Sequence, residues 1–211
     1  MTETETPRTT APAVSPIADP GPLGLAAFAL TTFLLSAHNA DWTDGTSAWL
    51  GFAFAYGGLV QLLAGMWEFR NRNVFGATAF STYGGFWIGL GLYVQLSEPT
   101  AAKLGGANAE SLVQNDLGWI LLAFAIFNTY MLLWSTQVNG AVFGVFLTLE
   151  VTEIVLFIGN FSHSTGTVKL GGWIGVLTAI VAWYASAAGV TNGMDSTRFR
   201  LPVGKPFGLK S

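Results

Sequence analysis

The stretch VNGAVFGVFLTLEVTEIVLFIGN, residues 138–160, decides the fold. A helix that crosses a membrane needs about 20 consecutive, mostly apolar residues, and this stretch supplies them. Because lipid offers no hydrogen-bond partners to the backbone, a continuous apolar run of this length folds as a helix. The other structure that spans membranes, a β-barrel, needs alternating segments of about 10 residues, and no such alternation is present. The stretch therefore predicts a transmembrane helix.

Similar apolar stretches, rich in Leu, Ala, Phe and Gly, recur along the rest of the chain. We expect an all-α integral membrane protein that folds as a single bundle of six transmembrane helices. Short turns join the helices, apart from a longer loop expected at 96–115. A disordered cytoplasmic tail at 1–20 and a second cytoplasmic tail at 191–211 flank the transmembrane domain at 21–190. The six spans are expected at residues 22–38, 47–69, 74–95, 116–135, 138–160 and 168–190.

The composition of the chain excludes several classes of protein. Hydrophobic residues make up 51% of the 211 residues and charged residues 10%, whereas a soluble domain carries about 25% charged residues. This excludes an ordinary cytosolic enzyme, a disordered regulator and a nucleic-acid binder. The chain has no cysteine and two histidines, so we expect no metal site and no cofactor. It also has no HExxH, GxSxG or GxxxxGK[ST] motif, so we expect neither an enzyme nor an ATP-driven pump.

The basic residues predict the orientation of the chain. Lysine and arginine together number nine. Two of them, Lys103 and Lys169, fall on the side of the membrane opposite the termini. Because cytoplasmic loops carry the excess of basic residues, we expect both termini in the cytoplasm and the bundle in the plasma (inner) membrane. The seven basic residues on the side of the termini are Arg8, Arg70, Arg72, Arg198, Arg200, Lys205 and Lys210.

Glycine motifs recur in the third and sixth expected spans. GGFWIG occupies residues 84–89, and GGWIG occupies 171–175. Three spans are an odd number, so a three-plus-three repeat would be inverted, as in many transporters. Such glycine–aromatic runs are also common in membrane helices without any repeat. Glycines four residues apart let helices approach closely, either within the bundle or between subunits.

Two carboxyl groups, Glu150 and Glu153, interrupt the fifth span. They are three residues apart and are therefore neighbours on a helix. Burial in lipid and mutual repulsion both favour the protonated form, so we expect at least one of them to be protonated near neutral pH. Two interpretations remain open. The pair is either a proton-coupling or gating group, or a structural group hydrogen-bonded to a neighbouring helix or subunit.

The first span begins at an unusual segment, DPGPLGL at 19–25. Proline resists the continuation of a helix towards the N-terminus but is accommodated in a first turn. The free N–H groups of such a helix start are able to face an anion. The simpler interpretation is a sharp helix boundary. The residues of interest in this segment are Asp19, Pro20, Pro22, Leu23 and Gly24.

The segment DPGPLGLAAFALTTFLLSAHNA resembles the NPAPLGL signature and first helix of the acetate uptake transporter family. That family includes bacterial succinate–acetate permeases and fungal acetate and ammonia-related transporters. Further similarity lies in AYGGLVQLLAGMWEFRNRNVFGATAFSTYGGFW at 55–87, LFIGN at 156–160 and GGWIG. The resemblance covers about residues 19–190. The chain departs from the signature at Asp19 and Gly21, and an aspartate there would cap the helix but weaken an anion site.

The resemblance implies a six-helix protomer, assembled as a homo-hexamer in the lipid bilayer, with a path for acetate through each protomer. Family members are described as proton-coupled permeases or as anion channels. The family's constriction is formed by an aromatic residue, a tyrosine and a leucine. The matching positions are Phe28, Tyr83, and either Leu149 or Leu147.

We therefore expect the transport of acetate and related short-chain carboxylates, with no nucleic-acid partner. Gln61, Thr31 and Thr32, together with Tyr83, would donate hydrogen bonds to a carboxylate that has lost part of its hydration. An apolar collar would obstruct hydrated ions. Glu150 or Glu153 would be the proton-linked group. The alternatives are a passive pore for neutral small molecules such as ammonia or water, and a non-transporting membrane organiser.

Overall fold

The computed structural model describes residues 17–45 and 47–207. Most of the tail expected at 1–20 therefore lies outside the described residues. Every regular element in the described ranges is helical. The elements are α1 (Gly21–Asn39), α2 (Ser47–Phe52), the π-helix η1 (Ala53–Val60), α3 (Gln61–Arg70), α4 (Val74–Leu104), α5 (Gly106–Ser135), α6 (Gly140–Phe161) and α7 (Thr165–Gly193).

Five helical segments in the described part of the chain are long and apolar enough to cross a membrane. These confirm the prediction of an all-α membrane protein, and α4 is a further long helix beside them. The second segment is continuous through α2, η1 and α3, because the chain passes from one helix type to the next without a break. The five segments are Gly21–Asn39, Ala48–Arg70, Glu110–Ser135, Gly140–Phe161 and Thr165–Gly193.

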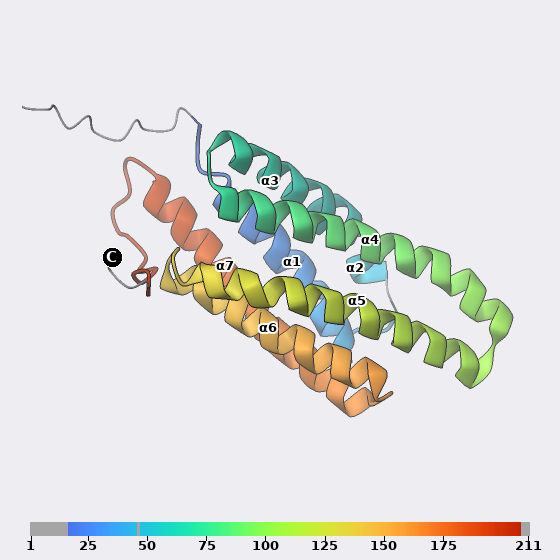
Figure 1. Ribbon diagram of the computed structural model, residues 1–211. Coiled ribbons are helices and arrows are strands. Elements are labelled where there is room, and N and C mark those ends of the chain that lie inside the picture. The colour runs from blue at the N-terminus through green and yellow to red at the C-terminus, as the bar shows by residue number, and fades with distance from the viewer. Residues whose placement is uncertain (1–16, 46, 208–211) are drawn as a thin grey trace, which may run out of the picture.

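The loop predicted at 96–115 is wrong. Helices α4 and α5 continue through this region and break only at Gly105. Gly105 and Gly106 have φ angles of 67° and 64°, a left-handed conformation that glycine adopts without steric cost. The flanking residues are rich in alanine, which has the highest helix propensity. A tight glycine turn thus produces a long hairpin of α4 and α5, seen at the right of Figure 1.

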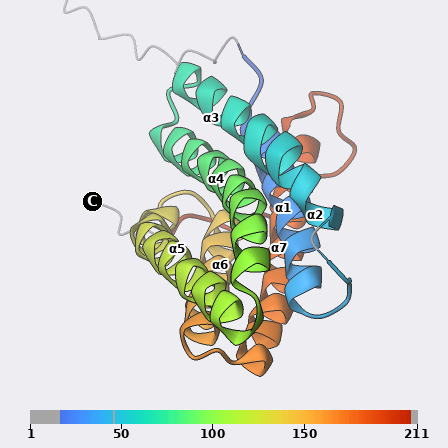
Figure 2. The same ribbon diagram turned by 90° about the vertical axis from the view of Figure 1, so that its right-hand side faces the viewer.

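The helices run side by side along one axis (Figures 1 and 2). Helix α1 lies inside the bundle, where it packs most extensively on α7 and also contacts η1 and α3. Helix α6 packs between α5 and α7. The start of α1 lies next to the C-terminal part of α7, because Pro22 packs against Gly189. We call this end of the bundle the terminal end.

Glycines at the helix contacts of α7 allow close packing. A Cβ at Gly172 would lie 2.4 Å from the backbone of Ala40, and a Cβ at Gly171 would reach Leu156. These glycines therefore act within the bundle. In contrast, Gly85 and Gly89 have open space at the Cβ position, so that face of α4 is free within the protomer.

The segment after α7 folds back onto the terminal end. Helix α7 itself ends at Gly193, slightly beyond the boundary predicted at 191. Asn192 exchanges two hydrogen bonds of 2.9 Å with Leu201. The carbonyl of Val203 accepts a hydrogen bond of 2.8 Å from the amide of Ala141, at the start of α6. The described part of this segment is therefore packed against helices α6 and α7.

Candidate functional site

Three residues predicted to form a constriction meet in the core of the bundle. Phe28 on α1, Tyr83 on α4 and Leu149 on α6 belong to one cluster of buried side chains. The ring centroids of Phe28 and Tyr83 are 5.8 Å apart in an edge-to-face arrangement. Leu147 does not join them, because its side chain is 42% exposed on the outer face of α6. The helical period explains this difference, since residues two apart lie on opposite sides of a helix.

Cavities lie on both sides of this cluster. The first is a small cavity of about 40 Å³, lined by all three constriction residues, which we call the chamber. The second has a volume of about 160 Å³ at the terminal end, where Asp19 and Glu68 line it. Residues of the same core cluster line both cavities, so the cluster separates them.

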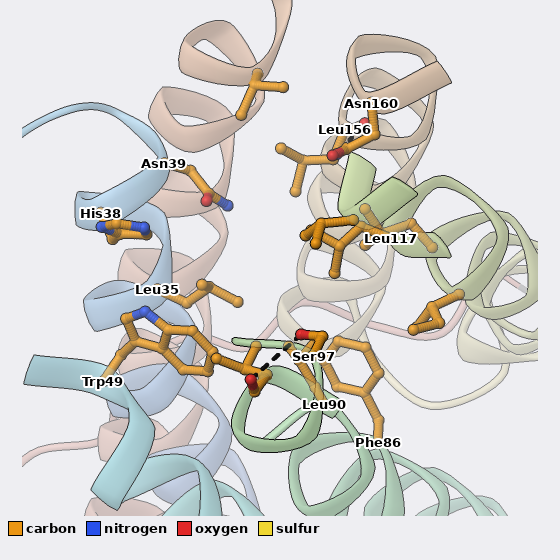
Figure 3. A pocket seen from close by; sticks show the side chains of 15 residues that line it. Leu35, His38, Asn39, Trp49, Phe86, Leu90, Ser97, Leu117, Leu156 and Asn160 are labelled. Atoms are coloured by element: carbon orange, nitrogen blue, oxygen red, sulfur yellow. Dashed lines mark hydrogen bonds between the residues drawn. The ribbon is translucent and has the colours of Figure 1, made fainter. Parts of the chain in front are cut away.

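A larger cavity of about 340 Å³ continues from the chamber towards the opposite end of the bundle. The two cavities share Leu35, Asn39, Phe86 and Leu156 among their lining residues. Figure 3 shows this larger cavity between α1, α4, α5 and α6, with an almost entirely apolar wall. Its polar lining residues are His38, Asn39, Ser97 and Asn160, together with Trp49, whose indole carries an N–H.

A hydrogen-bond network joins the two carboxyl groups of α6 through Tyr83. The Tyr83 hydroxyl lies 3.0 Å from Oδ1 of Asn128 and 3.3 Å from Oε1 of Glu153. Nδ2 of Asn128 donates to Oε2 of Glu150 at 2.7 Å and to the carbonyl of Phe146 at 3.0 Å. These two contacts orient the Asn128 amide, so that its Oδ1 atom, which is an acceptor, faces the Tyr83 hydroxyl.

The Tyr83 hydroxyl has one proton and two neighbouring acceptors, so its hydrogen bond depends on the state of Glu153. If Glu153 is ionised, Tyr83 is able to donate to it, but Oδ1 of Asn128 then loses its donor. If Glu153 carries a proton on Oε1, it donates to Tyr83, and Tyr83 donates to Asn128. Since an unsatisfied buried polar atom costs about 1–3 kcal/mol, protonated Glu153 satisfies this network better. The protonation state of Glu153 therefore determines which acceptor the Tyr83 hydroxyl bonds to.

The remaining predicted ligands occupy different environments. Thr32 is buried and lines the chamber. Thr31 faces the other side of α1, where it packs on Gly57 and bonds to the carbonyl of Ala27 at 3.1 Å. Gln61 is 1% exposed and contributes to none of the three cavities described above. The structure thus brings Thr32, but neither Thr31 nor Gln61, to the chamber.

The unusual segment before α1 shapes the terminal end. Oδ1 of Asp19 accepts a hydrogen bond of 2.9 Å from the amide of Gly21, and the carbonyl of Pro20 accepts the first helical bond from Gly24 at 3.1 Å. Gly24 packs directly on the ring of Phe80. Asp19 and Pro22 line the terminal cavity, whereas Leu23 is 48% exposed.

The sequence alone did not indicate the roles of two other residues at this site, Asn128 and Trp87. Asn128 connects the carboxyl groups, and its presence as a polar residue in an apolar span was the only signal for such a role. Trp87 lines the chamber, yet a tryptophan in a membrane helix does not by itself indicate a polar contact. Both roles depend on neighbours from other helices, which no spacing along the chain reveals.

A helical membrane protein with cavities on either side of an apolar constriction has the architecture of a channel or transporter. The chain belongs to the GPR1/FUN34/yaaH family, whose sequence profile matches residues 1–205. The resemblance found in the sequence is thereby confirmed.

Named relatives agree with this assignment. Acetate permease A of Emericella nidulans is 40% identical over 88% of this chain, and the aligned part spans 65% of that longer protein. The Succinate-acetate/proton symporter SatP of Escherichia coli is 33% identical, with 90% of this chain and 96% of that protein aligned. The solved structure of the bacterial acetate channel SatP superposes with a TM-score of 0.79 at 32% identity, covering 89% of this chain and 99% of the other. These relatives are named as transport proteins, not as enzymes.

Proposed function

We propose that this protein transports acetate and related short-chain carboxylates across the plasma membrane, by a path through each protomer. The observation that carries the proposal is the constriction of Phe28, Tyr83 and Leu149 with cavities on both sides. A small carboxyl compound has a polar head that needs hydrogen bonds and an apolar methyl group that tolerates such a wall. The names of the family relatives point to the same substrate.

Helix α4 completes the six spans in this proposal, and both termini face the cytoplasm. The basic residues support this orientation, because Arg70, Arg72 and Arg198 lie near the terminal end while Lys169 lies in the N-terminal part of α7 at the other. An inverted repeat of three plus three spans is supported by the glycine motifs. Gly84 packs on Leu62 of α3, and Gly171 packs on Leu156 of α6, so each contacts the preceding span.

The protomer assembles into a homo-oligomer, a hexamer by resemblance to the family. The open face of α4 at Gly85 and Gly89 supports a subunit contact, because small residues let membrane helices approach closely. The substrate path lies within each protomer and does not require the central axis of the assembly.

Glu153 is the proton-linked group in this proposal, and Glu150 supports it through Asn128. Glu153 is 4% exposed, lines the chamber and contacts Tyr83 of the constriction. Glu150 is only partly buried and bonds to Asn128 and Thr129, at 2.7 and 2.8 Å. Proton binding to Glu153 changes the hydrogen bond of Tyr83, so it couples protonation to the path.

The transport proposal is tested with the purified protein in liposomes. Uptake of labelled acetate is measured with and without a pH gradient, after subtraction of uptake by protein-free liposomes. We expect saturable uptake that propionate inhibits and ammonia does not. No saturable uptake above protein-free liposomes would overturn the transport proposal. Inhibition by ammonia but not propionate would favour a passive pore for neutral small molecules.

The role of Glu153 is tested by Glu153→Gln, which keeps the size of the side chain and removes its titration. At a constant concentration of undissociated acid, we expect acetate uptake by this variant to lose its dependence on pH. Glu110→Gln on α5 is the matched control, because Glu110 is exposed and lies outside the three cavities. If Glu153→Gln keeps the pH dependence of the wild type, Glu153 is not the proton-linked group.

A further inference from the structure

The cavities along the path carry an electrostatic character that does not fit an anion. Among the described residues, no lysine or arginine lines the large cavity, the chamber or the terminal cavity. Acidic side chains line two of the three, namely Glu153 in the chamber and both Asp19 and Glu68 at the terminal end. A carboxylate in this path would meet other carboxyl groups and, among the described residues, no fixed positive charge.

Three residues that line the chamber have buried polar atoms without a hydrogen-bond partner in the described chain. These atoms are Oγ1 of Thr32, Nε1 of Trp87 and Oε2 of Glu153. Their residues are 6%, 3% and 4% exposed, respectively. Because an unpaired buried polar group is costly, three of them around one cavity indicate a site that is completed by a ligand.

The chemistry of these atoms defines the ligand. The indole N–H of Trp87 is only a donor, and the hydroxyl of Thr32 is able to donate or accept. Oε2 of Glu153 is an acceptor when the group is ionised, and also when the proton sits on Oε1 towards Tyr83. The ligand must therefore bring one donor and at least one acceptor. A carboxylic acid has both groups, whereas a carboxylate has acceptors only.

The volume of the chamber restricts the size of the ligand. At about 40 Å³ the chamber is the smallest of the three cavities described above. Acetic acid, with four non-hydrogen atoms, is a ligand of correspondingly small size. The larger cavity of about 340 Å³ outside it has room for longer acids.

We propose that the chamber binds the undissociated form of a small monocarboxylic acid and that this neutral molecule is the species transported. The acid O–H donates to Oε2 of Glu153, and its carbonyl oxygen accepts from Trp87 and Thr32. The methyl group lies against Leu35 and Leu149, which line the same cavity. The proton enters and leaves with the acid, so no net charge moves and Glu153 returns to its starting state.

The titratable groups near this site fit the proposal. Tyr83 on α4 and Glu150 on the same helix as Glu153 are the titratable side chains that interact with it. His38 on α1 lines the adjacent large cavity and not the chamber. None of these provides a permanent positive charge for an anion. The inference rests on the proposed transport function and specifies its substrate form.

The first test separates the neutral acid from the anion by the membrane potential. Liposomes with equal pH on both sides receive a potential of 100 mV, positive inside. A monovalent anion is distributed about fifty-fold in favour of the positive side at equilibrium, so its uptake depends steeply on this potential. We expect the protein-dependent uptake of labelled acetate to change less than twofold. A steep rise with the potential would overturn the inference while leaving acetate transport intact.

The second test uses two planar competitors of the same size as acetate. Acetamide is uncharged and has both donors and an acceptor, whereas nitrate is an anion with acceptors only. We expect acetamide to inhibit acetate uptake and nitrate to have no effect at equal concentration. Inhibition by nitrate but not by acetamide would overturn the neutral-acid site.

A variant of the chamber connects the competition to the proposed residues. Thr32→Val keeps the shape of the side chain and removes one hydrogen bond, so we expect acetamide to inhibit roughly three- to tenfold more weakly. Thr148→Val is the matched control, because the Thr148 hydroxyl bonds to the backbone of its own helix. If acetamide inhibits Thr32→Val and the wild type equally, Thr32 does not bind the ligand. Trp87→Phe provides the same test for the indole donor.

Discussion

Tyr83 contributes both to the packing of the core cluster and to the hydrogen-bond network of the buried carboxyl groups. Its ring packs edge-to-face on Phe28, Phe86 and Phe127, which holds it in the constriction. Its hydroxyl is the only link between Asn128 and Glu153 among the contacts described above. The ring is therefore held in place by packing, while the hydroxyl proton is able to change its acceptor.

Removal of this hydroxyl separates packing from hydrogen bonding. Tyr83→Phe keeps the aromatic contacts but leaves Oδ1 of Asn128 and Oε1 of Glu153 without a partner. We expect the free energy of unfolding to fall by about 1–3 kcal/mol, as measured by thermal unfolding in detergent. We also expect acetate uptake to persist with a weaker dependence on pH. Tyr130→Phe, at a side chain that is 45% exposed, is the control and should leave both measurements unchanged.

A second residue-scale prediction concerns Asp41 in the loop after α1. The hydrogen bond and positive charge of Lys169, 2.6 Å away, lower the pKa of Asp41 below its ordinary value of 3.8. A carboxyl group with a lowered pKa in the folded state stabilises the fold above its unfolded pKa, and this contribution disappears as the pH falls through the folded pKa.

The substitution Asp41→Asn tests this ion pair with little change of backbone strain. Asp41 has a φ angle of 67°, and asparagine tolerates that left-handed conformation as well as aspartate does. We expect the wild type to melt slightly above the variant at pH 6, and the difference to decline as the pH falls below 3.8. High salt should also reduce the difference, because both groups are exposed. A difference that grows as the pH falls would contradict this interpretation.

At the scale of the elements, the π-helix η1 brings the second span against α1. π-Helical turns are rare and are frequently found at functional sites. Gly57 is buried in η1, and a Cβ at this position would lie 2.6 Å from Oγ1 of Thr31. The close approach therefore depends on the absence of a side chain. The sequence indicates a helix at 47–69 but no change of helix type, because that change depends on packing with α1.

A matched pair of substitutions tests this contact. Gly57→Ala should destabilise the protein by about 1–3 kcal/mol, because the added methyl group overpacks the contact with Thr31. Gly51→Ala lies in the preceding α2 with open space around it, and should be stabilising by about 0.5–1 kcal/mol. Thermal unfolding of both variants in the same detergent measures the effects. Two shifts of the same sign would contradict the proposed close packing.

At the scale of the whole molecule, both described ends of the chain lie at one end of the bundle. The first described residue, Ile17, lies at this end, and residues 194–207 fold back beside the start of α6. The terminal cavity is lined by Asp19 from the first of these segments and Val203 from the second. The inner mouth of the proposed path is therefore assembled from the two segments that are furthest apart in the sequence.

The proposed orientation is testable with single cysteines, since the natural chain has none. Ser196→Cys lies at the terminal end and Ser162→Cys lies in the turn between α6 and α7, both at exposed positions. In intact cells, a membrane-impermeant maleimide should label Ser162→Cys but not Ser196→Cys. Permeabilised cells should show labelling of both variants. The reverse pattern in intact cells would invert the topology.

The sequence by itself determined that this protein lies in a lipid bilayer and where its helices fall along the chain. The reason is that apolar runs of about 20 residues have few ways to satisfy their backbone hydrogen bonds in lipid. Five spans and the family assignment follow from those runs and from local motifs. Only the tertiary structure decided that Leu149 rather than Leu147 joins Phe28 and Tyr83, and that Thr32 rather than Thr31 faces the chamber. It also decided the partners of Glu153. These features depend on the rotation of each helix about its axis, which is set by contacts between distant segments and not by the spacing of residues within one.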